Sequence, residues 1–119
     1  MMAPITDKQF KELYMAAEGR NLGAVFSYSE PEEPTPLNFS FEERKSIFLW
    51  VLMRLLKEGR IKLAKHGKFL EGSVEEQVEL FRLALPKTEE EMEDGIWFFD
   101  EDCPGGAVWV LENGSLEWT

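Results

Sequence analysis

Hydrophobic and polar residues follow one another along the chain in patterns that predict about four helices and a small β-sheet. Between positions 10 and 17, apolar side chains recur three or four residues apart, as they do on one face of an α-helix. Thr6 and Gln9 are spaced as in a capping box, in which each side chain bonds the backbone of the other residue. The pattern predicts a first helix that ends at Gly19, and residues 20–28 predict a short second helix.

The longest predicted helix lies in the middle of the chain. A loop precedes it in residues 29–39, because prolines lack a backbone N–H and interrupt regular hydrogen bonding; these prolines are Pro31, Pro34 and Pro36. Ser40 and Glu43 form a second capping box, and Gly59 closes the helix. Its wide apolar face consists of Phe41, Ile47, Phe48, Val51, Leu52, Leu55 and Leu56.

A strand and another helix follow. Apolar residues alternate with lysines in residues 61–65, as in a half-buried strand, and residues 66–69 predict a turn. Ser73 and Glu76 then form a third capping box. The apolar periodicity behind this box predicts a helix that Pro86 ends.

The last third of the chain combines a short acidic helical turn with two strands. Thr88 begins the turn and Gly95 ends it. Residues 107–111 are rich in β-branched side chains, and the turn sequence ENGS separates them from residues 115–118. With residues 61–65, these two segments predict a small antiparallel sheet. The predicted fold class is therefore α+β, with about four helices packed on this sheet.

The composition supports a single domain that spans residues 1–119. With 44% hydrophobic and 13% aromatic residues, the chain can bury a core without disulfides or metals. Its one cysteine excludes an intramolecular disulfide. The N-terminus lacks a basic region followed by an apolar stretch, and no apolar run approaches the length of a membrane span. We therefore expect a cytoplasmic protein with no membrane partner.

Charge is distributed unevenly along the chain. The formal net charge is −10, which argues against nucleic acid as a partner because its phosphates would be repelled. Residues 41–70 nevertheless carry eight bases and three acids. Residues 89–102, which we name the acidic segment, carry eight acids and no base. Most of the excess negative charge therefore lies in this one stretch.

No pattern of residues indicates catalysis. His66 is the single histidine and lies in a predicted turn between two lysines, with no nucleophile or orienting group nearby in the sequence. Cys103 follows three acids, whose negative charges raise the pKa of a thiol, so we expect it to be a poor nucleophile with a structural role. The sequence therefore predicts a protein that is not an enzyme.

A partial calcium-loop pattern begins at Asp100. Asp102 and Gly105 continue it, but Pro104 and Leu111 stand where the third ligand and the closing bidentate glutamate belong. We therefore predict no metal site and no other cofactor.

Large apolar residues interrupt the acidic segment, which contains the sequence IWFF at positions 96–99. If some of these side chains are exposed, they form an apolar anchor surrounded by charge, as in many tight protein interfaces. If all of them pack into the core, the acids merely cap a helix and keep the protein in solution. The predicted partner-binding residues are Glu89, Glu90, Asp94, Trp97, Phe98, Asp100, Glu101 and Asp102.

Residues 40–92 read SFEERKSIFLWVLMRLLKEGRIKLAKHGKFLEGSVEEQVELFRLALPKTEEEM, and residues 95–110 read GIWFFDEDCPGGAVWV. These stretches resemble a family of small bacterial proteins catalogued as a domain of unknown function, and the similarity spans nearly the whole chain. Members of that family occur in Neisseria-like and Haemophilus-like bacteria, and some are associated with islands of two-partner-secreted toxins. The resemblance implies an immunity protein of a contact-dependent growth inhibition system, which binds its cognate toxin domain without catalysis.

The acidic segment and the resemblance lead to the same hypothesis. Many such toxins are nucleases with positively charged clefts, onto which an acidic protein is steered. We expect carboxylates of the acidic segment to pair with bases of the toxin, and Trp97 or Phe98 to be the apolar anchor. The alternative is an intracellular homo-oligomeric or regulatory protein, such as a homodimer that joins basic residues 41–70 to the acidic segment of a second copy.

Overall fold

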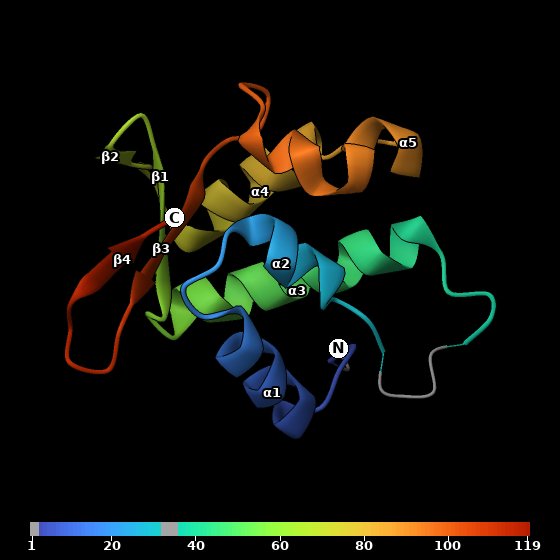
Figure 1. Ribbon diagram of the computed structural model, residues 1–119, viewed down its shortest axis with the longest axis horizontal. Coiled ribbons are helices and arrows are strands. Elements are labelled where there is room, and N and C mark those ends of the chain that lie inside the picture. Colours follow the sequence, from blue (N-terminus) through green and yellow to red (C-terminus); the bar gives the residue numbers. More distant parts are fainter. Residues whose placement is uncertain (1–2, 32–35) are drawn as a thin grey trace.

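The computed structural model describes residues 3–31 and 36–119, so Pro34 of the predicted loop lies outside the described residues. The elements, in chain order, are α1 (Asp7–Ala17), α2 (Leu22–Ser27), α3 (Phe41–Lys57), β1 (Ile61–Lys65), β2 (Lys68–Phe69), α4 (Val74–Ala84), α5 (Glu89–Met92), a 3₁₀ segment η1 (Glu93–Phe99), β3 (Gly106–Val110) and β4 (Leu116–Trp118). Figure 1 shows the strands gathered at one end of the molecule, with α3 running through its middle between α1 and α4. The predicted α+β class is confirmed.

Side-chain caps begin the helices where the sequence predicts them. At α3 the Ser40 hydroxyl accepts a hydrogen bond from the Glu43 N–H at 3.1 Å, and the Glu43 carboxylate accepts one from the Ser40 N–H at 3.3 Å. Ser73 and Glu76 cap α4 in the same reciprocal way. Thr6 caps α1 through its hydroxyl alone. The capping boxes therefore fix where α3 and α4 begin, since each satisfies two backbone donors that the first turn leaves unpaired.

The sheet is antiparallel and has the strand order β2-β1-β3-β4. It has one strand more than predicted, because residues 68–69 return along β1 instead of continuing the turn. His66 and Gly67 both have left-handed backbones, with φ of 54° and 77°. Two consecutive residues with positive φ make the tight hairpin turn whose twist matches that of the flanking strands. The predicted turn is thus confined to these two residues.

Side chains from every layer meet in one core. Phe48, Val51, Leu52 and Leu55 of α3 are fully buried, and β1 and β3 contribute the inward-facing side chains of the sheet. Trp109 of β3 is also fully buried, and its indole Nε1 donates a hydrogen bond to the Arg20 carbonyl at 2.8 Å. None of the helices in the described residues has both the length and the apolar character needed to cross a membrane.

The face of the sheet that points away from this core is covered by two of its own side chains. Phe69 on β2 and Trp118 on β4 stack with ring centroids 5.3 Å apart and an interplanar angle of 27°. In the strand register, Phe69 is paired with Ala64, and Trp118 with Val108, so all four share this outer face. Ala64 and Val108, which share this face with the aromatic pair, are buried.

Candidate acidic binding surface

The acidic segment leaves the helical conformation earlier than predicted. Thr88 caps α5 as expected, but the helix ends at Met92 rather than at Gly95. Glu93, Asp94 and Gly95 follow with φ of 51°, 54° and 94°, three left-handed residues in succession. L-residues adopt this conformation at an energetic cost. This turn directs residues 96–99 back toward α2 and the core, since η1 packs against α2.

The four apolar residues of the acidic segment divide into a buried pair and an exposed pair. Trp97 and Phe98 are only 5% and 8% exposed, whereas Ile96 and Phe99 are 61% and 72% exposed. A 3₁₀ helix has three residues per turn, so residues three apart lie on the same side. The prediction that Trp97 or Phe98 is a surface anchor is therefore wrong, and Ile96 and Phe99 are the apolar side chains at the surface.

Phe98 attaches the acidic segment to the core. Its ring lies 5.7 Å from Phe26 of α2 and 5.6 Å from Phe48 of α3, measured between centroids. Trp97 packs edge-on against it at 5.2 Å. Such tilted and edge-to-face arrangements are favourable for aromatic rings. The carboxylates of the segment are thus displayed from a backbone that is fixed by buried contacts.

Four carboxylates of the segment surround a groove of about 760 Å³ beside the C-terminal end of α4. They come from both ends of the segment and are Glu91, Glu93, Asp100 and Asp102. Leu83 of α4, which is 70% exposed, and the buried Trp97 contribute apolar surface to the same groove, which we name the acidic groove. Lys87 is the one base among the described residues that line it.

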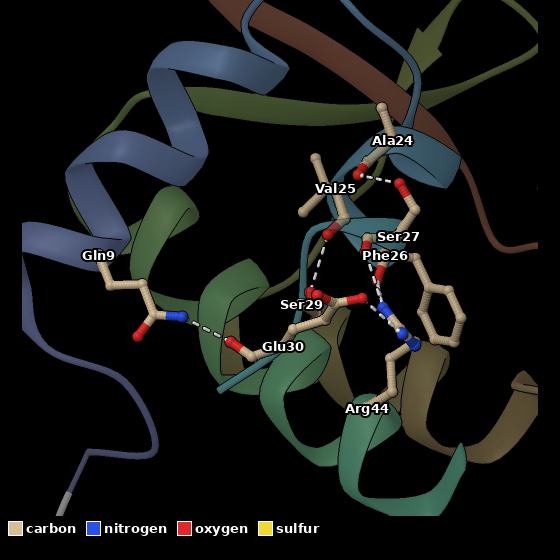
Figure 2. A network of polar contacts seen from close by, with 8 residues as sticks. All are labelled: Gln9, Ala24, Val25, Phe26, Ser27, Ser29, Glu30 and Arg44. Carbon is tan, nitrogen blue, oxygen red and sulfur yellow. Dashed lines mark hydrogen bonds and ion pairs between the residues drawn. The ribbon is translucent and has the colours of Figure 1, made fainter. Parts of the chain in front are cut away.

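Two other residues that were predicted to bind the partner line a different pocket. Glu89 and Asp94 line a hollow of about 330 Å³ between α2, the start of α3 and the acidic segment, together with Arg44. Arg44 does not pair with either of them. Its guanidinium donates to the Ser27 carbonyl at 2.6 Å and to the Glu30 carboxylate at 2.8 Å, as Figure 2 shows.

A contact of Glu30 also explains why the predicted Thr6–Gln9 capping box is only half formed. The Gln9 side chain, which the sequence predicts to bond Thr6, instead donates to the Glu30 carbonyl at 2.6 Å (Figure 2). Glu30 is therefore held by Gln9 through its backbone and by Arg44 through its carboxylate. These contacts connect α1 and α3 to the segment that follows α2. The charge of Arg44 is therefore paired within the molecule.

Glu101 contacts the turn between β1 and β2. Its carboxylate lies 3.2 Å from His66 Nε2 and 3.5 Å from Lys65 Nζ. Lys65 also donates to the backbone carbonyls of Glu101 and Cys103. The electrostatic effects of His66 and Lys65 lower the pKa of Glu101. Glu101 thus anchors the segment to the sheet, while Glu90 lies exposed on α5.

The other paired bases of residues 41–70 bond acids outside the acidic segment. Their ion pairs are Arg44–Glu30, Lys45–Glu42, Arg54–Asp7, Arg54–Glu58, Lys57–Glu75 and Arg60–Glu58. Lys65 and His66 alone among the described bases of this stretch reach the acidic segment. The negative charge around the acidic groove is therefore left largely uncompensated by the described part of the chain.

Cys103 is buried, and its thiol Sγ donates to the Gly105 carbonyl at 3.3 Å. Burial raises its pKa, and the charge of Asp100 adds a smaller effect in the same direction. The predicted direction is confirmed, but desolvation rather than neighbouring acids is the main cause. In the described residues, histidine, cysteine and acidic side chains nowhere form a cluster of three that could hold a metal ion.

The acidic groove contains some of the residues predicted from the sequence. Of the predicted residues, Asp100, Asp102 and Trp97 meet in the acidic groove. Glu91 and Glu93, which were not among the predicted site residues, complete it. The spacing of Glu91 and Glu93 from the other carboxylates gives no signal in the sequence, because only the left-handed turn brings the two ends of the segment together.

The fold and the acidic groove define the chain as a small α+β protein with a concentrated anionic surface. Residues 56–119, more than half of the chain, match the family described as "Protein of unknown function, DUF596", and the chain belongs to that family. Its structure is similar to that of an uncharacterised protein conserved in bacteria, from Neisseria meningitidis, with a TM-score of 0.75 and 28% sequence identity. That similarity covers 93% of this chain and 87% of the other.

The comparison with curated proteins gives no match. The predicted resemblance to a family of unknown function is confirmed for residues 56–119, and the similar structure comes from a bacterium, as that resemblance implies. The link to toxin immunity stays a prediction.

Proposed function

We propose that the chain is a non-catalytic immunity protein that binds a cognate toxin domain through the acidic groove. The observation that carries this proposal is a groove lined by four acidic residues and by apolar residues, with one lysine to offset the negative charge. A lysine or arginine side chain of the partner fits such a groove, because its aliphatic stem packs on the exposed Leu83 while its charged end meets the carboxylates.

Two exposed apolar side chains lie in the same segment. Ile96 and Phe99 do not line the acidic groove, but they neighbour Asp100 and Asp102 in the chain, so a partner that extends beyond the groove can bury them. Apolar contacts of this kind supply affinity, whereas the surrounding charge mainly accelerates association and selects a basic partner. A toxin that acts on nucleic acid presents such a basic cleft, because it must hold phosphates.

Charge reversal tests the proposal. The double variant Asp100→Lys and Asp102→Lys should lose protection of cells against the cognate toxin and should bind the purified toxin domain at least tenfold more weakly. Glu101 is left unchanged, because its contacts with Lys65 and His66 belong to the fold.

The matched control is the double variant Glu12→Lys and Glu112→Lys. It makes the same change in net charge at exposed positions on α1 and in the β3–β4 turn, away from the acidic groove. The control should retain protection. Full protection by the groove variant, or equal losses in both variants, refutes the acidic groove as the interface. Salt-sensitive self-association seen by light scattering, without toxin binding, favours the homo-oligomeric alternative.

A further inference from the structure

β4 forms an edge of the sheet that is open along its outer side. It pairs with β3 on one side only, and all three of its residues, Leu116, Glu117 and Trp118, are exposed. Figure 1 shows no described element on the other side of β4. An open edge of this kind presents backbone groups that can pair with another strand.

The register shows which backbone groups point outward. In an antiparallel ladder, hydrogen-bonded residue pairs alternate with pairs that are not hydrogen-bonded. The Thr119 N–H donates to the Ala107 carbonyl, and the Leu111 N–H donates to the Ser115 carbonyl. The Trp109–Glu117 pair lies between them and is therefore also of the hydrogen-bonded type. The N–H and C=O groups of the intervening residues, Leu116 and Trp118, consequently point away from β3.

The side chains of β4 add chemical selectivity to this edge. Leu116 and Trp118 lie on the outer face of the sheet, where Trp118 stacks on Phe69. Glu117 lies on the opposite face, with its carboxylate close to Gly19 at the end of α1. The three side chains along the edge are therefore apolar, acidic and apolar in turn.

We propose that β4 binds an extended peptide segment as a fifth strand of the sheet. The bound segment has apolar side chains beside Leu116 and Trp118 and a lysine or arginine beside Glu117, because opposite charges on neighbouring strands attract. This site goes beyond the function proposed above, since it shares no residue with the acidic groove.

A second copy of the chain is a poorer occupant of this edge. Two antiparallel β4 strands that pair over all three residues place Glu117 directly opposite its own counterpart. Like charges opposite each other destabilise a strand pair. A basic residue at that position instead neutralises Glu117, which has no ion pair among the described residues.

The probe is a capped peptide of alternating valine and lysine, titrated into the 15N-labelled protein and followed by NMR. Amide signals of Leu116 and Trp118 should shift. The same peptide with glutamate in place of lysine should bind about fivefold more weakly. A version of the peptide in which every valine nitrogen is methylated should not bind. It lacks the backbone N–H donors on the edge that pairs with β4.

Variants of the protein complete the test. Leu116→Pro removes an outward N–H and breaks no hydrogen bond to β3, so it should abolish binding while the circular dichroism spectrum is retained. Glu117→Lys should reverse the preference between the lysine and glutamate peptides, whereas Glu112→Lys in the adjacent turn should not. Equal binding of the N-methylated peptide, or no binding of the lysine peptide, overturns the proposal. It is also overturned if ultracentrifugation detects a dimer that Leu116→Pro dissociates. The N-methylated peptide decides the matter if Leu116→Pro does not fold.

Discussion

Truncation of Phe98 should be among the most destabilising single substitutions in the acidic segment. Its ring is 8% exposed and packs on Phe26, Phe48 and Trp97 at centroid distances of 5.7, 5.6 and 5.2 Å. Loss of a buried phenylalanine side chain costs about 3–5 kcal/mol through lost apolar contact and the cavity left behind. For a chain of 119 residues, this corresponds to a fall in melting temperature of about 12–20 °C.

Phe99→Ala provides the matched comparison, because it removes the same ring from the next position. Phe99 is 72% exposed, so its truncation should change the free energy of unfolding by less than about 0.5 kcal/mol. Urea unfolding followed by circular dichroism measures both values. If the two variants lose equal stability, or if Phe99→Ala loses more, the assignment of the buried and exposed sides of η1 is wrong. The same pair then distinguishes structure from binding, since Phe99→Ala should weaken toxin binding without loss of stability.

Cys103 should react slowly with dithiobisnitrobenzoate in the folded protein and rapidly in urea, because burial protects the thiol and raises its pKa; equal rates in the two conditions contradict that burial. Burial alone would raise the pKa of Glu58, but hydrogen bonds from Arg54 and Arg60 lower it overall, so the carboxylate stabilises the fold above its unfolded pKa. The stability that the wild-type protein has over Glu58→Gln should therefore vanish as the pH falls through the folded pKa, and urea titrations that show a constant difference down to about pH 3 refute this linkage. Glu93→Gly should raise the free energy of unfolding by about 0.5 kcal/mol, because glycine tolerates the φ of 51° there; a lower melting temperature speaks against it.

The helices and the first strand could be predicted from local signals. Ser40 with Glu43, and Ser73 with Glu76, are three residues apart, and the same spacing forms the capping boxes in the structure. The alternation in residues 61–65 gives β1 with the predicted bounds. These features depend on neighbours in the sequence, so the sequence is sufficient to locate them.

Other features depend on contacts that no local pattern encodes. β2 has only two residues, too few to show alternation, and it exists because His66 and Gly67 reverse the chain onto β1. The IWFF run has no polar residue inside it, so helical, 3₁₀ and strand periods could not be distinguished. Its division into Trp97 and Phe98 inside and Ile96 and Phe99 outside follows from the 3₁₀ geometry of η1. The acidic groove likewise required the left-handed turn that brings the ends of the acidic segment together.

The stacked pair on the outer face of the sheet gives the protein a built-in optical reporter. Trp118 is the most exposed of the four tryptophans, at 51%, whereas Trp97 and Trp109 are buried in the core and Trp50 of α3 is partly buried. An indole in contact with water emits at longer wavelength than a buried one and is quenched more readily by acrylamide. Binding or a conformational change at the sheet edge should therefore alter the long-wavelength side of the fluorescence spectrum. A change in the core should alter its short-wavelength side. One unlabelled sample can thus report on the two regions separately.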